Sequence, residues 1–254
     1  MVDLVDELRG RVAIVTGSAR NIGRATAEEL ARAGAALVVN AVQARALCEE
    51  VAEGIRSRGG RAVPFVADVR DPDAVNAMAA VAVKEFGGID IVVHNAAVRS
   101  FTAIEAMDFT VFRRTVETSI HGCSHLAKAA LPSMKTRGGG SFIGVGGMTS
   151  TRGSPGRTHT MAAKLGQGAF IRGLAYDLAP YAIRANQVVV GTFDTERIGN
   201  PSSAGESPIR SPIPLGRKGV PQDIANLIRF LVGPGGDYIT GQTIHSNGGA
   251  WMNP

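Results

Sequence analysis

The sequence predicts a single-domain α/β protein with a doubly wound parallel sheet of about seven strands, flanked by helices on both faces. Short apolar stretches rich in β-branched residues alternate with segments in which apolar residues recur every three to four positions. The stretches are apolar throughout rather than at every second residue, as expected for strands buried on both faces. A glycine-rich turn joins the first strand-like stretch to the first helix-like segment.

The elements follow in order along the chain, and they define one domain over residues 1–254. Strands are expected at residues 11–15, 36–39, 62–66, 89–93, 141–145, 185–190 and 243–245. Helices are expected at residues 22–33, 41–58, 73–86, 109–135, 161–181 and 221–231. Residues 196–214 fit neither pattern, because four prolines fall within 199–214. We expect a substrate lid there, and a passive mobile surface loop is the open alternative.

The composition excludes several classes of protein. With 44% hydrophobic and 19% charged residues, the chain is not a disordered or charge-dense scaffold. Two cysteines cannot build a disulfide framework, no apolar run spans a bilayer, and the N-terminus is acidic where a secretory signal is basic. We therefore expect a cytoplasmic protein with no membrane partner. The net charge of +5 comes from scattered arginines with few aromatics, so we expect no nucleic-acid partner.

Residues 16–23 read Thr-Gly-Ser-Ala-Arg-Asn-Ile-Gly and lie between the first expected strand and helix. Glycines at such a turn let backbone N–H groups approach a pyrophosphate at a helix N-terminus. An ordinary strand–helix connection is the alternative. The placement of the turn favours a phosphate-binding role.

This turn resembles the Thr-Gly-x-x-x-Gly-x-Gly signature of the short-chain dehydrogenase/reductase family, and further segments match in register over residues 8–251. They are Asp68-Val69, Asn95-Ala96-Ala97, the residues 183–186, 191–195, 214–217 and 238–242, and Gly248-Gly249. The chain is most similar to the 3-oxoacyl-carrier-protein reductase type. The resemblance implies a Rossmann-type fold, a pyridine dinucleotide cofactor and a homotetramer or homodimer, with Trp251 and the C-terminal tail in the subunit contact.

The resemblance also implies the residues that bind the cofactor, with Asp68 facing the adenine and the segment 191–195 holding the nicotinamide. Two positions depart from the family pattern. Asn21 replaces a glycine, and Asn is well suited to a left-handed conformation; Val190 replaces a proline. The implied set is Gly17, Ser18, Arg20, Asn21, Ile22, Gly23, Asn40, Asp68, Val69, Asn95, Ala96, Lys164, Gly191, Phe193 and Thr195.

NADP is the favoured cofactor, with NAD as the alternative. Residues 38–42, at the end of the second strand, contain no carboxylate for a ribose 2′-hydroxyl. Arg20 in the turn suits a 2′-phosphate, and the resemblance associates an arginine there with NADP-preferring members. A solvated surface role for Arg20 stays open.

Three of the four catalytic positions implied by the resemblance carry unexpected residues. The family uses Asn, Ser, Tyr and Lys, and the corresponding residues are Ser119, Gly147, Thr160 and Lys164. The tyrosine would supply the proton, since the nearby lysine lowers its pKa, and the serine would polarise the carbonyl. A threonine hydroxyl is far less acidic than a phenol (~10) and its side chain is shorter. The usual mechanism therefore does not operate unchanged, and Lys164 is expected to hold the nicotinamide ribose.

Several side chains are candidate substitutes, each with a structural role as the alternative. His159 adjoins the tyrosine position, and free histidine titrates near ~6.5, but neighbouring helical residues point about 100° apart. Thr149 or Ser150 could replace the serine. His94 or Arg99 could bind an anion, and Arg197 and Arg210 in the expected lid also favour an acidic substrate. The spacing of His121, His125 and His245 indicates no metal site.

Three functions remain in competition. The first is an NADP-dependent oxidoreductase acting on a small carbonyl or alcohol, with a substitute or water-relayed proton donor. The second is a catalytically silent dinucleotide binder, which the loss of three catalytic residues favours. The third is a different reaction in the same cleft, such as a lyase or isomerase step.

Overall fold

The computed structural model describes residues 6–98, 100–194 and 212–252. Its centre is a seven-stranded, all-parallel sheet in the order β3-β2-β1-β4-β5-β6-β7. The strands are β1 Val12–Val15, β2 Ala36–Ala41, β3 Arg61–Val66, β4 Ile91–His94, β5 Gly140–Gly147, β6 Ile183–Val190 and β7 Thr243–Ser246. The strand order reverses between β1 and β4, so the sheet is doubly wound and the predicted fold class is confirmed.

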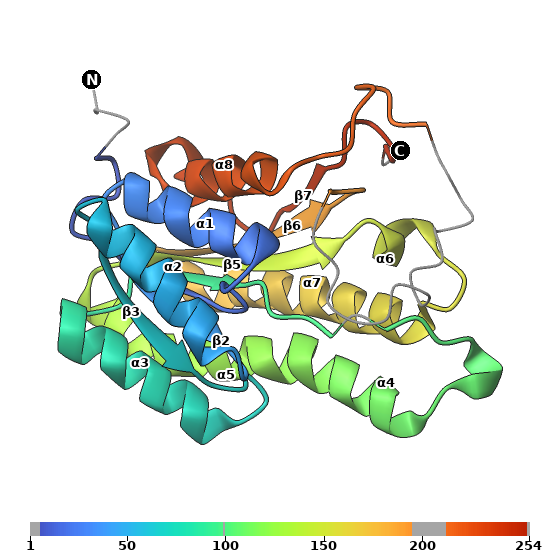
Figure 1. The fold of residues 1–254 in the computed structure, drawn as a ribbon, viewed down its shortest axis with the longest axis horizontal. Coiled ribbons are helices and arrows are strands. Elements are labelled where there is room, and N and C mark those ends of the chain that lie inside the picture. The colour runs from blue at the N-terminus through green and yellow to red at the C-terminus, as the bar shows by residue number, and fades with distance from the viewer. Residues whose placement is uncertain (1–5, 99, 195–211, 253–254) are drawn as a thin grey trace.

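Helices cover both faces of the sheet (Figure 1). In chain order they are α1 Asn21–Arg32, α2 Arg45–Ser57, α3 Pro72–Phe86, α4 Phe109–Val116, α5 Gly122–Thr136, α6 Thr149–Arg152, α7 Thr158–Leu178 and α8 Pro221–Val232. One core lies between the sheet and α1, α2 and α8, and a second lies between the sheet and α3, α5 and α7. Alternate residues of one strand feed the two cores: Ala13 and Val15 pack in the first, Val12 and Ile14 in the second.

The helix expected at 161–181 lies at Thr158–Leu178, and two other expected helices differ more from the structure. The helix expected at 41–58 begins only at Arg45, because β2 stays paired with β3 as far as Ala41. The helix expected at 109–135 is interrupted by a π-helical turn, Glu117–His121, between α4 and α5. Such turns are rare and occur frequently at functional sites. This one contains Ser119.

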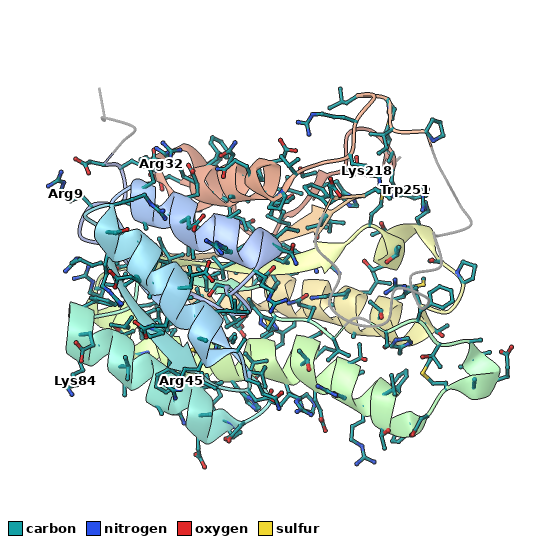
Figure 2. All side chains as sticks on the ribbon, viewed as in Figure 1. Arg9, Arg32, Arg45, Lys84, Lys218 and Trp251 are labelled. Carbon is teal, nitrogen blue, oxygen red and sulfur yellow. The ribbon has the colours of Figure 1, made fainter. Side chains whose placement is uncertain are left out.

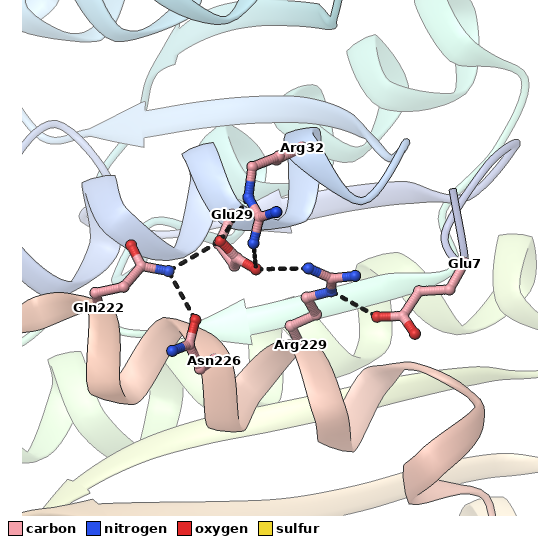
Figure 3. A network of polar contacts seen from close by, with 6 residues as sticks. All are labelled: Glu7, Glu29, Arg32, Gln222, Asn226 and Arg229. Carbon is pink, nitrogen blue, oxygen red and sulfur yellow. Dashed lines mark hydrogen bonds and ion pairs between the residues drawn. The ribbon is translucent and has the colours of Figure 1, made fainter. Parts of the chain in front are cut away.

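A buried ion-pair network fixes α8 against α1 (Figure 3). Glu29 of α1 accepts hydrogen bonds from Arg32, from Arg229 and Gln222 of α8, and Arg229 also pairs with Glu7 at 2.6 Å. Burial alone would raise the pKa of Glu29, but these donors together lower it. The network therefore joins α1 to α8 and to the segment before β1.

Other cationic side chains lie well apart from one another, as Figure 2 shows for Arg9, Arg45, Lys84 and Lys218. Within the described part of the chain, no helix has both the length and the hydropathy that crossing a membrane requires.

Candidate active site

The turn between β1 and α1 has the backbone conformation that its glycines and Asn21 permit. Gly17 and Asn21 both have left-handed backbones, with φ of 62° and 51°. The conformation predicted for Asn21 is therefore confirmed. A Cβ atom on Gly23 would lie 2.2 Å from the carbonyl oxygen of Gly17 and 2.6 Å from Nδ2 of Asn95. Only glycine fits at position 23.

The N-terminus of α1 is open to an anion. Arg20 at the N-cap makes no side-chain capping bond, and the first turn contains no acidic residue. The first N–H groups of a helix have no acceptor within the helix, and they favour negative charge. Together with the close approach of Gly17 and Gly23, this arrangement fits the pyrophosphate of a dinucleotide.

Three of the residues that the resemblance assigns to cofactor binding have buried side chains that stabilise the turn. The hydroxyl of Ser18 donates to the carbonyl of Val15 at 2.7 Å, and the N–H of Asn40 donates to Ser18 Oγ at 2.9 Å. Nδ2 of Asn40 donates to the carbonyl of Ala67 at 3.0 Å, and Ile22 is in the core. Because the side chains of Ser18, Ile22 and Asn40 are buried, they brace the turn.

The segment after β4 is bound tightly to the same turn. Nδ2 of Asn95 donates to the carbonyls of Thr16 and Gly17, both at 3.0 Å. Oγ1 of Thr16 accepts the N–H groups of Asn95 and Ala96, both at 3.1 Å. The implied residues Asn95 and Ala96 therefore lie beside Gly17.

His94 has the structural role that is the alternative to anion binding. His94 is fully buried, and its Nε2 lies 3.0 Å from the carbonyl of Thr118. That carbonyl can only accept, so Nε2 carries the proton and Nδ1 accepts from the hydroxyl of Thr16 at 3.2 Å. Burial, followed by the charge of Lys164, lowers the pKa of His94 to about 3. A neutral, enclosed imidazole does not bind an anionic substrate, and it links the turn to the π-helical segment instead.

Asp68 and Val69 follow β3, which ends at Val66. The carboxylate of Asp68 accepts Nη2 of Arg70 at 2.6 Å, and this hydrogen bond lowers the pKa of Asp68. The side chain of Val69 is buried, and a Cβ on Gly122 would lie 2.8 Å from it. An aspartate two residues before an arginine is the sequence signal for this ion pair, which was not among the predictions.

A cleft of about 610 Å³ opens beside the turn. Two arginines line it. Arg24 pairs with Glu50 at 2.8 Å, whereas Arg20 has no carboxylate partner among the described residues. The cleft is lined by Ala19, Arg20, Asn21, Arg24, Leu47, Glu50 and Asp194. An arginine in this position is available for a phosphate group.

Lys164 is held inside the protein by two acceptors. Its Nζ donates to the carbonyl of Val145 at 2.6 Å and to Oε1 of Gln167 at 3.0 Å. Gln167 is fully buried and lies on α7 one turn beyond Lys164. The sequence analysis missed Gln167, although a glutamine three residues after a candidate lysine on a helix is a usable signal.

The other implied catalytic positions offer little chemistry. Thr160 lies on α7, which packs against β5, the strand that ends at Gly147, and against the π-helical turn that contains Ser119. The hydroxyl of Thr160 is buried and has no hydrogen-bond partner among the described residues. A Cβ on Gly147 would meet no atom within 4 Å, and Ser119 is buried. Ser150 does not supply the missing catalytic hydroxyl, because its own hydroxyl donates to the carbonyl of Gly147 at 2.6 Å.

His159 contacts a loop that the sequence analysis did not connect with it. Its Nε2 lies 2.7 Å from the hydroxyl oxygen of Ser100, in the loop after β4. Burial, followed by the charge of Arg157, lowers the pKa of His159. The imidazole is fully enclosed, so it does not itself line the cleft.

The segment after β6 is fixed by two close packings. A Cβ on Gly191 would lie 2.6 Å from Cα of Asn247, and the ring of Phe193 lies against Gly219. Thr195, Arg99, Arg197, Arg210 and most of the expected lid at 196–214 lie outside the described residues. Among the residues that the structure describes, no three His, Cys, Asp or Glu side chains gather as a metal site.

The sheet order and the glycine-rich turn together define a Rossmann-type α/β protein, and comparisons with known proteins identify the family. The family model described as Enoyl-(Acyl carrier protein) reductase matches residues 17–250. The L-rhamnose 1-dehydrogenase (NAD(P)(+)) of Azotobacter vinelandii is 36% identical over 96% of this chain and 97% of its own. The 3-oxoacyl-acyl-carrier-protein reductase FabG of Haemophilus influenzae is 34% identical over 97% and 100%.

A solved structure agrees. A 7α-hydroxysteroid dehydrogenase complexed with NADH and 7-oxo glycochenodeoxycholic acid superposes with a TM-score of 0.89, at 28% identity over 98% of both chains. The chain belongs to the short-chain dehydrogenase/reductase family, a family of oxidoreductases.

Proposed function

We propose that this protein binds NADP(H) in preference to NAD(H) and uses it to interconvert a carbonyl and an alcohol on a small substrate. The observation that carries the proposal is the open N-terminus of α1 behind a turn in which Gly23 has no room for a side chain. Two features support NADP. Arg20 has no carboxylate partner among the described residues, and β2 ends in Asn40 and Ala41 without an acid.

In such a reaction, different residues of the chain bind the pyrophosphate and the ribose of the cofactor. The bound cofactor supplies or accepts a hydride at the substrate carbon. The turn and the first N–H groups of α1 hold the pyrophosphate, and Asn95 keeps the turn and the β4 loop together. The Lys164 ammonium is positioned to hold ribose hydroxyls once it exchanges its bonds to Val145 and Gln167. The Thr160 oxygen is buried, so the proton for the carbonyl oxygen comes from solvent water.

A silent dinucleotide binder is the second candidate. The open space at Gly147 and the buried hydroxyl of Thr160 favour it, because neither residue delivers a proton. It differs from the first candidate only in turnover.

A thermal-shift titration followed by an assay separates the two. A ligand that binds only the native state raises the melting temperature, so NADPH is expected to raise it more than NADH does. The absorbance of reduced cofactor is then followed with 2,3-butanedione, quinones and acetoacetyl thioesters. Consumption of NADPH supports the oxidoreductase; binding without consumption supports the silent binder. A melting temperature unchanged by either nucleotide would contradict both.

A further inference from the structure

We propose that Ser100 donates the hydrogen bond that polarises the substrate's carbonyl oxygen, in place of the serine that Gly147 does not provide, and that His159 positions it. This assignment rests on the proposed carbonyl–alcohol chemistry. It makes Ser100 a catalytic residue and His159 a positioning residue.

Ser100 is held in a fixed place at the carboxyl edge of the sheet. Its loop leaves β4 directly after Asn95 and Ala96, which contact the phosphate turn. The same loop is fastened to the segment that begins α7. Nη1 of Arg157 donates to the carbonyl of Ser100 at 3.2 Å, and the N–H of Thr102 donates to the carbonyl of Gly156 at 3.0 Å.

Aromatic packing completes this attachment. The guanidinium of Arg157 lies 5.6 Å from the centre of the Phe101 ring, and a Cβ on Gly156 would lie 2.7 Å from that ring. The loop therefore meets the first turn of α7 in a defined register. That turn contains Thr160, the residue at the implied proton-donor position.

The tautomer of His159 decides what the hydroxyl of Ser100 can do. Nε2 of His159 lies 2.7 Å from Ser100 Oγ, and Nδ1 is buried without a partner in the described structure. Buried N–H groups without an acceptor are rarer in proteins than buried acceptors without a donor. The proton of the neutral imidazole is therefore on Nε2 and is donated to Ser100 Oγ. The O–H of Ser100 is then left to donate elsewhere.

Other hydroxyls of this region are unavailable for the same task. The Thr160 oxygen is enclosed, Ser150 donates to the carbonyl of Gly147, and Ser119 is buried. Ser100 is only partly buried, unlike Ser119 and Ser150. A donor that is already oriented stabilises developing negative charge more than a freely rotating one does.

The chemical step balances with solvent as the proton source. The carbonyl carbon receives a hydride and forms a C–H bond, and the π electrons move to the oxygen. Ser100 donates a hydrogen bond to this alkoxide without losing its proton. Water then protonates the alkoxide to give the alcohol, and the hydroxide that remains passes to the solvent.

The test is a set of variants assayed with NADPH and either 2,3-butanedione or the acetoacetyl thioester of N-acetylcysteamine. Ser100→Ala is expected to lower kcat by about 10- to 100-fold with little change in KM, since the lost bond is made mainly in the transition state. Ser100→Thr retains a hydroxyl and is expected to recover part of the rate. Ser154→Ala, in the neighbouring loop, is the matched control with unchanged kinetics.

His159→Gln is expected to lower kcat less than Ser100→Ala, and to have no further effect in the Ser100→Ala background, because it acts through that hydroxyl. A merely structural role would instead give additive losses that accompany a lower melting temperature. Full activity of Ser100→Ala would overturn this assignment and leave the oxidoreductase proposal intact. A wild-type protein that binds NADPH but turns over neither probe would overturn both.

Discussion

The cofactor side and the substrate side of the cleft are built with different degrees of constraint. On the cofactor side, Gly23 has no room for a Cβ, and Asn95 bonds to two carbonyls of the turn. On the substrate side, Gly147 faces open space and the Thr160 hydroxyl has no partner among the described residues. Backbone packing fixes the first set, whereas only the chemistry of a reaction would fix the second. Catalytic residues can therefore be replaced while the fold and the turn persist.

The largest expected effect compares two glycines on the two sides. Gly23→Ala places a Cβ 2.2 Å from a backbone oxygen, so we expect a loss of about 2–4 kcal/mol in the free energy of unfolding and loss of NADPH binding. The Cβ that Gly147→Ala adds meets no atom within 4 Å, so we expect little change in the free energy of unfolding or in NADPH binding. Urea unfolding and nucleotide titration measure the pair. Equal effects of the two substitutions would show that the contrast between the sides is false.

The second prediction concerns His94, which joins the two sides. Its pKa is about 3 in the folded protein, below the ordinary 6.5, so the unfolded chain binds one more proton between these values. Stability from this group is complete above pH 6.5 and is lost as the pH falls through that window, by about 1.4 kcal/mol per pH unit. His94→Asn is expected to flatten the acid slope of urea-unfolding curves by that amount.

The measurement that reports on His94 is the slope of the free energy of unfolding against pH. The free energy itself is not informative, since the substitution also removes two hydrogen bonds and lowers stability at every pH. His121→Asn, on the exposed side of the π-helical turn, is the matched control. An unchanged slope in His94→Asn would mean that folding does not lower the pKa of His94.

The third prediction restores the missing chemistry. Gly147→Ser with Thr160→Tyr is expected to raise carbonyl reduction by about 10- to 100-fold, because a phenol near Lys164 is a better acid than water. Gly147→Ser with Thr160→Phe is the matched control, since it fills the same space without the hydroxyl. Steady-state assays with NADPH and 2,3-butanedione measure both. If the tyrosine variant folds, binds NADPH and gains nothing over the phenylalanine variant, the substrate side has lost more than these two side chains.

The same contrast explains what the sequence could predict. The order of strands and helices and the left-handed Asn21 depend on local patterns and on one turn, and both agree with the structure. The enclosure of His94 and the bond from Lys164 to the carbonyl of Val145 depend on contacts between distant elements, which periodicity does not reveal. Ser100 and His159 are 59 residues apart, so their contact has no local signal. The π-helical turn was missed because its composition does not differ from that of a helix.

The smallest expected effect concerns the choice between NADP and NAD on the cofactor side. Packing determines the turn, but the choice between NADP and NAD depends on exposed charge at its edge, which is easier to change. Arg20→Ala is expected to weaken NADPH binding about tenfold and to leave NADH binding unchanged, because one charge-assisted contact to a 2′-phosphate is lost. Ala41→Asp should shift the preference further toward NADH by repelling that phosphate. Arg24→Ala is the matched control, since Arg24 lines the same cleft but is already paired with Glu50. Equal losses from Arg20→Ala and Arg24→Ala would indicate general electrostatic attraction in the cleft rather than recognition of a 2′-phosphate by Arg20.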